Sequence, residues 1–232
     1  MDASEVLEWL EKKGTRKVRD GMSRYGIVAQ HAVGVPMAML MTLSKKLGPD
    51  HPLAIELWES GCYEARLLAS MVGEPELVTR AEMDAWAASF ENWADCDTVC
   101  FKLWDRSPFA WDKARQWSKS PHELIKRGGF VLMACLALHD RGSPDAQFLA
   151  FLPLIEKGAA DERNIVMKAV SWALRSIGRR NRTLHQASID LARRLAEDKA
   201  AAPRWIGKDA LRELSSAKVR ERLAKKAPAA RK

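Results

Sequence analysis

The sequence has few cysteines and no long apolar run, and both absences narrow what the protein can be. Its 4 cysteines, among 232 residues, include no Cys-x-x-Cys pair. A disulfide framework or metal site is therefore not expected, and no cofactor is predicted. No stretch approaches the length of a membrane-spanning helix, and the N-terminal MDASEVLEWLEKKG is too charged for a signal peptide. These features predict a soluble cytoplasmic protein.

Strand-like alternation is also missing, whereas helix punctuation recurs along the chain. Residues suited to an N-cap precede the apolar segments; they are Ser4, Thr15, Asp50, Thr79, Ser120 and Ser143. Several segments, such as YEARLLASMV and FVLMACLALHD, are apolar on more than one side, which is typical of helices sandwiched between neighbours. The predicted fold is therefore all-α, a HEAT-like helical-repeat solenoid forming a single curved domain.

The charge of the chain is concentrated toward its C-terminus. The formal net charge is +8, but residues 1–160 hold 19 Lys+Arg against 22 Asp+Glu, and residues 161–232 hold 19 against 8. Such asymmetry favours a polyanionic partner, most simply nucleic acid, although a solvated basic surface explains it equally well. The predicted domain covers residues 1–224, and KKAPAARK at residues 225–232 is predicted to be a disordered basic tail.

One short segment combines an aromatic ring with acidic side chains. In SFENWADCDTVC, residues 89–100, Trp93 and Asp97 are four residues apart, so a helix would place them on one face. A lone tryptophan in a helix is commonly a core residue, and an aspartate near a helix start commonly caps it. Asp95 is a second carboxylate that competes with Asp97 for any catalytic role.

Two further candidates lie in the second half of the chain. Arg127 places a charge in the otherwise apolar LIKRGGFVLM, and Trp172 lies in MKAVSWALRSIG. Arg127 could instead pair with Glu123, one helical turn earlier. In a solenoid, equivalent faces of successive repeats line one surface, so residues distant in sequence can converge there.

The order and spacing of these four residues resemble the AlkD-like DNA alkylation repair glycosylases, which are small HEAT-repeat proteins. The similarity runs from about Tyr25 to about Leu214. Trp93 and Asp97 match the family's W-x-x-x-D, with its tryptophan and catalytic aspartate, while Arg127 matches its phosphate-facing arginine and Trp172 its second tryptophan.

The resemblance implies a monofunctional glycosylase that hydrolyses the N-glycosidic bond of positively charged N3- or N7-alkylated purines. It implies a monomer acting on double-stranded DNA near the nucleoid, without a tight base-flipping pocket. Asp97 would stabilise the sugar cation, and Trp93 and Trp172 would present their ring faces to it. Arg127 would bind a backbone phosphate, with helpers in the basic C-terminal region: Lys168, Arg175, Arg179, Arg180 and Arg182.

Two alternatives remain open from the sequence. The chain could be a non-catalytic helical-repeat protein that binds damaged or branched DNA, or a protein-binding scaffold. The sequence also departs from the family pattern at one place. GVPMAMLMTLSKKL has Met37, Ala38 and Met39 where the family usually carries polar or basic residues. That difference argues against DNA contacts from this end of the chain.

Overall fold

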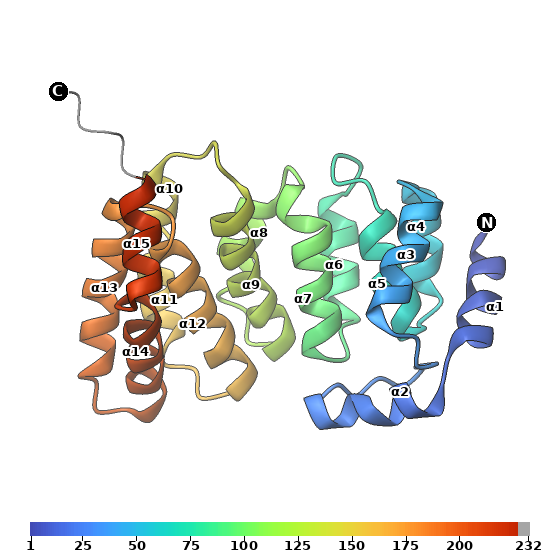
Figure 1. Ribbon diagram of the computed structural model, residues 1–232, viewed down its shortest axis with the longest axis horizontal. Helices are drawn as coiled ribbons and strands as arrows, with labels where there is room; N and C mark the ends of the chain where they lie inside the picture. Colours follow the sequence, from blue (N-terminus) through green and yellow to red (C-terminus); the bar gives the residue numbers. More distant parts are fainter. Residues whose placement is uncertain (227–232) are drawn as a thin grey trace. The chain divides into compact units, whose positions relative to one another are not determined.

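The computed structural model describes residues 1–226, and within that range every regular element is a helix. The prediction of an all-α helical-repeat fold is thus confirmed (Figure 1). None of the helices among the described residues is long and apolar enough to cross a membrane. The chain divides into two compact units, Met1–Phe109 and Ala110–Lys232. Continuity of one curved domain across that boundary stays a prediction.

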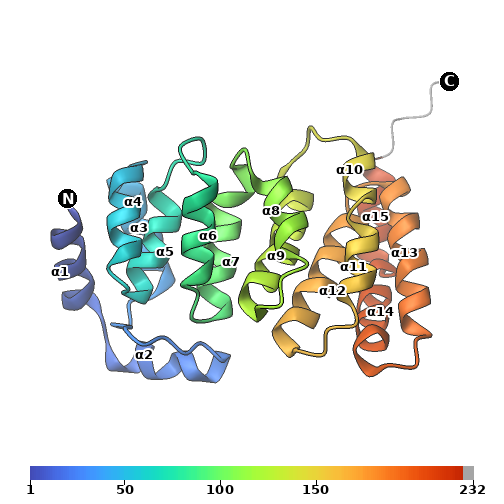
Figure 2. The ribbon, with the colours of Figure 1, turned by 180° about the vertical axis from the view of Figure 1, so that it is seen from behind.

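The first unit is a set of short helices with a tryptophan-rich core. Its elements are α1 (Ala3–Lys13), α2 (Arg16–Gly21), the 3-10 helix η1 (Met22–Tyr25), α3 (Met37–Leu47), α4 (His51–Glu59), α5 (Tyr63–Val72), α6 (Arg80–Ala88), α7 (Trp93–Lys102) and the 3-10 helix η2 (Trp104–Arg106). Trp58 and Trp86 stack with their ring centroids 4.2 Å apart, and both rings are buried. Figures 1 and 2 show α2 lying across the ends of α3, α5 and α7. Residues of these four helices line a cavity.

The second unit contains longer helices. Its elements are α8 (Ala110–Trp117), α9 (Glu123–His139), α10 (Asp145–Leu149), α11 (Leu152–Gly158), α12 (Asn164–Gly178), α13 (Arg182–Ala196), α14 (Ala201–Leu214) and α15 (Ala217–Lys226). α9 packs against α8 and α12, and α14 packs against α12 and α13. Because α9 is enclosed by neighbours, every residue from Arg127 to Ala137 is buried, as the all-round apolar pattern predicted.

Two glycines allow helices of the second unit to approach closely. A Cβ at Gly129 of α9 would lie 2.3 Å from the backbone nitrogen of Ser118, just after α8. A Cβ at Gly207 of α14 would lie 2.3 Å from the backbone nitrogen of Ala196 in α13. Real Cβ atoms do not approach so closely, so both helix pairs depend on glycine at these positions.

Three of the six predicted N-caps are correct, and the other three lie near the true N-cap but not at it. Thr15, Asp50 and Thr79 each accept a backbone hydrogen bond at the start of α2, α4 and α6. The predictions for Ser4, Ser120 and Ser143 are wrong: the N-caps of α1, α9 and α10 are Asp2, His122 and Pro144. Ser120 instead accepts a hydrogen bond from the backbone N–H of His122.

The predicted tail begins inside a helix. α15 extends to Lys226, so the helix includes the first two residues of the segment predicted to be disordered. The rest of that segment, 227–232, lies outside the described residues.

Candidate functional site

Helix α7 carries the first pair of candidate side chains, Trp93 and Asp97, and Asp95 helps to cap its N-terminus. Asn92 is the N-cap, and Asn92 and Asp95 form a reciprocal capping box. The buried carboxylate of Asp95 accepts hydrogen bonds from the backbone N–H groups of Glu91, Asn92 and Cys96, at 2.9, 3.4 and 2.7 Å. Asp95 therefore satisfies donors that a helix start leaves open, which identifies it as a structural residue.

Burial raises the pKa of Asp95 to about 6, although the three backbone N–H groups and Arg66 act in the opposite direction. The unfolded chain releases this proton near the ordinary pKa of aspartate, whereas the folded state, with its raised pKa, retains the proton to higher pH. We expect the contribution of Asp95 to the free energy of unfolding to fall by roughly 2–3 kcal/mol between about pH 4 and 6.

Urea unfolding of the wild type and Asp95→Asn across this pH range measures that contribution. The wild type should lose stability relative to the variant as the pH rises, and the difference should be constant above about pH 7. A difference that is independent of pH would show that Asp95 titrates with its ordinary pKa.

Trp93 and Asp97 lie one helical turn apart on α7, as the sequence predicted. Both side chains are half-buried, whereas the core tryptophans Trp58, Trp86 and Trp104 are at most 4% exposed. The indole Nε1 of Trp93 donates a hydrogen bond of 3.0 Å to the backbone carbonyl of Tyr25 at the end of η1. Trp93 is thus held against the N-terminal segment with part of its surface exposed, instead of being buried in the core.

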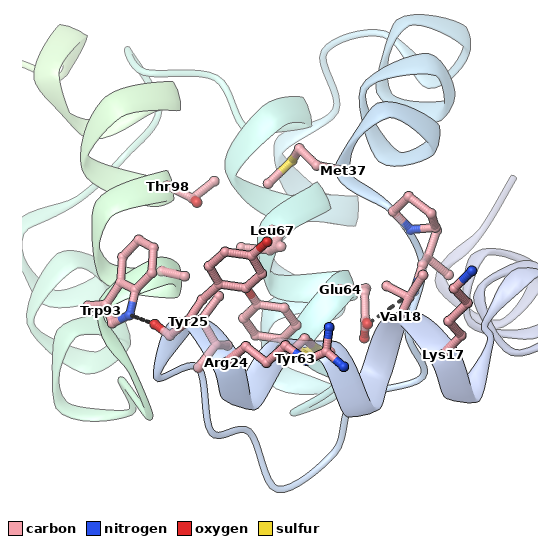
Figure 3. Close-up of a pocket in the computed structure, with 16 residues that line it drawn as sticks. Lys17, Val18, Arg24, Tyr25, Met37, Tyr63, Glu64, Leu67, Trp93 and Thr98 are labelled. Carbon is pink, nitrogen blue, oxygen red and sulfur yellow. Dashed lines mark hydrogen bonds between the residues drawn. The ribbon is translucent and has the colours of Figure 1, made fainter.

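A cavity of about 590 Å³ lies beside Trp93, within the first unit. Figure 3 shows Arg24 and Tyr25 of η1 on one side of it, and Trp93 and Thr98 of α7 on another. Its lining is mainly apolar, with two cationic residues, Lys17 and Arg24. Tyr25, at 73% exposure, lies at the cavity with its ring available for contact. An apolar cavity with aromatic and cationic groups can accept a flat ring beside an anionic backbone.

Glu64 holds the wall of this cavity, and the sequence did not indicate that role. This α5 carboxylate is only 1% exposed. It accepts hydrogen bonds from the backbone N–H groups of Val33, Gly34 and Val35, at 3.0, 2.7 and 3.3 Å. On the other side of the same segment, the backbone N–H of Thr15 donates to the carbonyl of Gly34 at 3.0 Å. Glu64 therefore links the segment before α3 to α5.

The second pair of candidates lies in the second unit. Arg127 on α9 is 6% exposed, and its Nη1 donates a hydrogen bond to the carbonyl of Ile165 at the start of α12. Trp172 on α12 is half-buried. Trp93 and Asp97 belong to one unit, and Arg127 and Trp172 to the other. The convergence of all four on one surface stays a prediction.

The predicted helper cations fall into two groups. Arg175 and Arg179 both pair with Glu213 of α14, the latter at 2.8 Å. Arg180 donates to the carbonyls of Ala137 and Asp140. Lys168 and Arg182 are exposed to solvent. Of these five, only Lys168 and Arg182 could bind a partner without the loss of a contact described above. DNA contacts by any of the five stay predictions.

The described residues contain no group of three or more His, Cys, Asp or Glu side chains that could hold a metal ion. The four cysteines are free thiols, and three of them are buried.

Comparison with known proteins identifies the family of the chain. Residues 6–214 match the family described as DNA alkylation repair enzyme, and the chain belongs to that family. A solved structure is described as a new family of proteins related to the HEAT-like repeat DNA glycosylases with affinity for branched DNA structures. It matches with a TM-score of 0.79 at 20% identity, over 96% of each chain. That similarity confirms the helical-repeat fold.

Two other matches are weaker. The uncharacterised protein Lin0241 of Listeria innocua is 24% identical over 150 residues, which is 64% of this chain. This chain spans 65% of the length of that relative. A designed armadillo-repeat protein in complex with a (KR)4 peptide reaches a TM-score of only 0.35 at 13% identity, which supports no further argument.

Proposed function

We propose that this protein is a monofunctional DNA glycosylase that excises N3- or N7-alkylated purines. The observation that carries the proposal is the different environment of the two carboxylates of α7. Asp95 is buried in the capping box, whereas Asp97 stays half-buried, one turn beyond a partly exposed tryptophan. Family membership over residues 6–214 supports the same chemistry.

The chemistry suits a site of this composition. Alkylation at N3 or N7 gives the purine a positive charge and makes it a good leaving group, so the transition state resembles a sugar oxocarbenium ion. The carboxylate of Asp97 stabilises that cation and orients the attacking water. The electron-rich faces of Trp93 and Trp172 favour positive charge on the nucleotide. In this proposal Arg127 exchanges its hydrogen bond to the carbonyl of Ile165 for one to a phosphate.

The cavity beside Trp93 fits the same proposal. Base-flipping enzymes enclose the target base in a tight pocket. In the proposed mechanism the base is not enclosed in this way. The cavity of about 590 Å³ adds room beside the proposed reaction centre. Bulky alkyl adducts are therefore expected to be accepted as well as methyl groups.

The direct test is single-turnover release of free base from duplex DNA that contains N7-methylguanine or N3-methyladenine. The proposal expects release at a rate well above spontaneous depurination, without strand cleavage. Undamaged duplex of the same sequence is the control. Absence of base release from both lesions would overturn the glycosylase proposal.

A second candidate function is non-catalytic binding of branched or damaged DNA. Two observations favour it: the relative with affinity for branched DNA shares the fold over 96% of the chain, and Arg127 is bound to a backbone carbonyl. This candidate expects tighter binding to a four-way junction than to linear duplex, with no base released. Measuring both affinities beside base release separates the two functions.

DNA affinity should fall as salt rises, because bound phosphates release counterions. Replacing the exposed Lys168 or Arg182 by Ala should reduce the slope of log affinity against log salt by about 1 each, for every sequence tested. Lys157→Ala removes an exposed charge that is not among the predicted contacts and is the matched control. Equal slopes for all three variants and the wild type would exclude Lys168 and Arg182 from the interface.

A further inference from the structure

A second cavity, of about 480 Å³, lies in the second unit and is rich in arginine. Its lining residues come from the end of α9, the start of α10, the C-terminal end of α12 and one position of α15. Its lining includes four guanidinium groups, from Arg141, Arg179, Arg180 and Arg222, and a single carboxylate, from Asp145.

The carboxylates around this cavity are already engaged. Asp145 accepts a hydrogen bond of 2.8 Å from the side-chain amide of Asn181. Asp140 lies just before Arg141. Burial acts to raise its pKa, but the hydrogen bonds that it accepts from Ser143, Gly142 and Trp111 outweigh burial and lower the pKa. Glu213 pairs with Arg179 and also with Arg175. Asp140 and Asp145 act electrostatically on Arg180, and Glu213 acts on Arg179. The lining itself still has four guanidinium groups against one carboxylate, so it keeps an excess of positive charge.

Two of the arginines are held rigidly in place. Arg180 donates to the carbonyls of Ala137 and Asp140, and its guanidinium lies 3.8 Å from the ring centroid of Phe148. Burial lowers the pKa of Arg179; the charge of Glu213 acts in the opposite direction, and the charges of Arg175 and Arg222 lower the pKa further. Among the described residues, none accepts a hydrogen bond from the buried Nε of Arg179. Arg179 and Arg180 are partly desolvated, and a partly desolvated cation gains more from an anion than a fully solvated one does.

We infer that this arginine cavity is a phosphate-binding site. A phosphate group presents several anionic oxygens, and guanidinium groups bind such oxygens in pairs with directional hydrogen bonds. The cavity also adjoins Asn181, the N-cap of the 15-residue helix α13, whose N-terminal dipole favours negative charge.

The site is separate from the phosphate contact predicted for Arg127. That residue binds the carbonyl of Ile165 at one end of α12, whereas Arg179 follows the other end. At 1.5 Å per residue, the two ends of this helix are about 20 Å apart. The inference concerns the second unit alone and does not depend on the proposed glycosylase activity.

The test uses the full chain and inorganic phosphate. In the wild type, the side-chain N–H signals of the lining arginines should shift saturably in NMR spectra as phosphate is added. Arg141→Gln with Arg222→Gln removes the two exposed members and leaves the structural contacts of Arg179 and Arg180 intact. This double variant should bind phosphate roughly tenfold more weakly, because two exposed, solvent-screened ion pairs with the phosphate are lost.

The matched control is Lys157→Gln with Arg193→Gln, which removes two exposed charges of the same unit from outside the cavity. Its phosphate affinity should stay within about twofold of the wild type, as expected for general electrostatics alone. Thermal melting of both double variants checks that they fold. Absence of a saturable shift in the wild type, or equal weakening in the two double variants, would overturn the inference.

Two sources could supply the phosphate, and duplex DNA binding by the same variants distinguishes them. If the cavity holds a backbone phosphate, the cavity variant should lose more DNA affinity than the control variant, and inorganic phosphate should compete with DNA. If it holds a small phosphate compound, DNA affinity should be equal in the two variants, while the difference in phosphate affinity persists. Both results support a phosphate site.

Discussion

Asp97→Asn is expected to slow single-turnover release of alkylated purine by roughly 100- to 1,000-fold, while DNA affinity holds or rises. Asparagine keeps the size of the side chain and removes the negative charge. In the proposed mechanism that charge interacts with the sugar cation, which exists only near the transition state. In the same proposed mechanism this charge faces DNA phosphates in the ground state, so its removal should not weaken binding.

Asp95→Asn is the matched control, because it makes the same chemical change on the same helix. Its effect should appear in thermal melting, with base release per folded molecule unchanged. If Asp97 merely stabilised the helix, its replacement would cost roughly 1 kcal/mol or less and leave release per folded molecule unchanged. If Asp95→Asn abolished release and Asp97→Asn did not, the assignment of the catalytic residue would be wrong.

The local structure around α7 was predictable from sequence, and the choice between its two aspartates was predictable only in part. The four-residue spacing placed Trp93 and Asp97 one turn apart, which the structure confirms. Asn92 and Asp95 have the three-residue spacing of a capping box, a signal that was present in the sequence. The difference in burial between Asp95 and Asp97 was not predictable in the same way, because burial depends on the helices that pack against α7.

Longer-range contacts explain what the sequence could not predict. Glu64 bonds N–H groups about 30 positions earlier in the chain, and no local pattern encodes that pairing. Likewise, Arg175 and Arg179 belong to a basic stretch, yet both pair with Glu213, more than 30 positions later. Charge counts therefore identified a basic region but did not show which of its side chains form ion pairs within the protein.

Glu64→Ala is expected to lower the free energy of unfolding by about 3–5 kcal/mol, because it leaves three N–H groups without their acceptor. Val33, Gly34 and Val35 donate those hydrogen bonds, two of them buried. For a protein of 232 residues the corresponding loss in melting temperature is about 10 °C. Hydrogen exchange at the N–H groups of Gly34 and Val35 should accelerate before the rest of the unit opens.

The effect should extend from stability to the cavity beside Trp93. Glu64 fixes the segment that leads into Pro36 and Met37, and both of these residues line the cavity. Release of a bulky adduct should therefore fall in Glu64→Ala even at temperatures where the chain stays folded. Glu56→Ala, at an exposed position on α4, is the control and should change stability by less than about 0.5 kcal/mol. A melting temperature for Glu64→Ala within about 1 °C of the wild type would show that the segment is held by its other contacts, such as the one between Thr15 and Gly34.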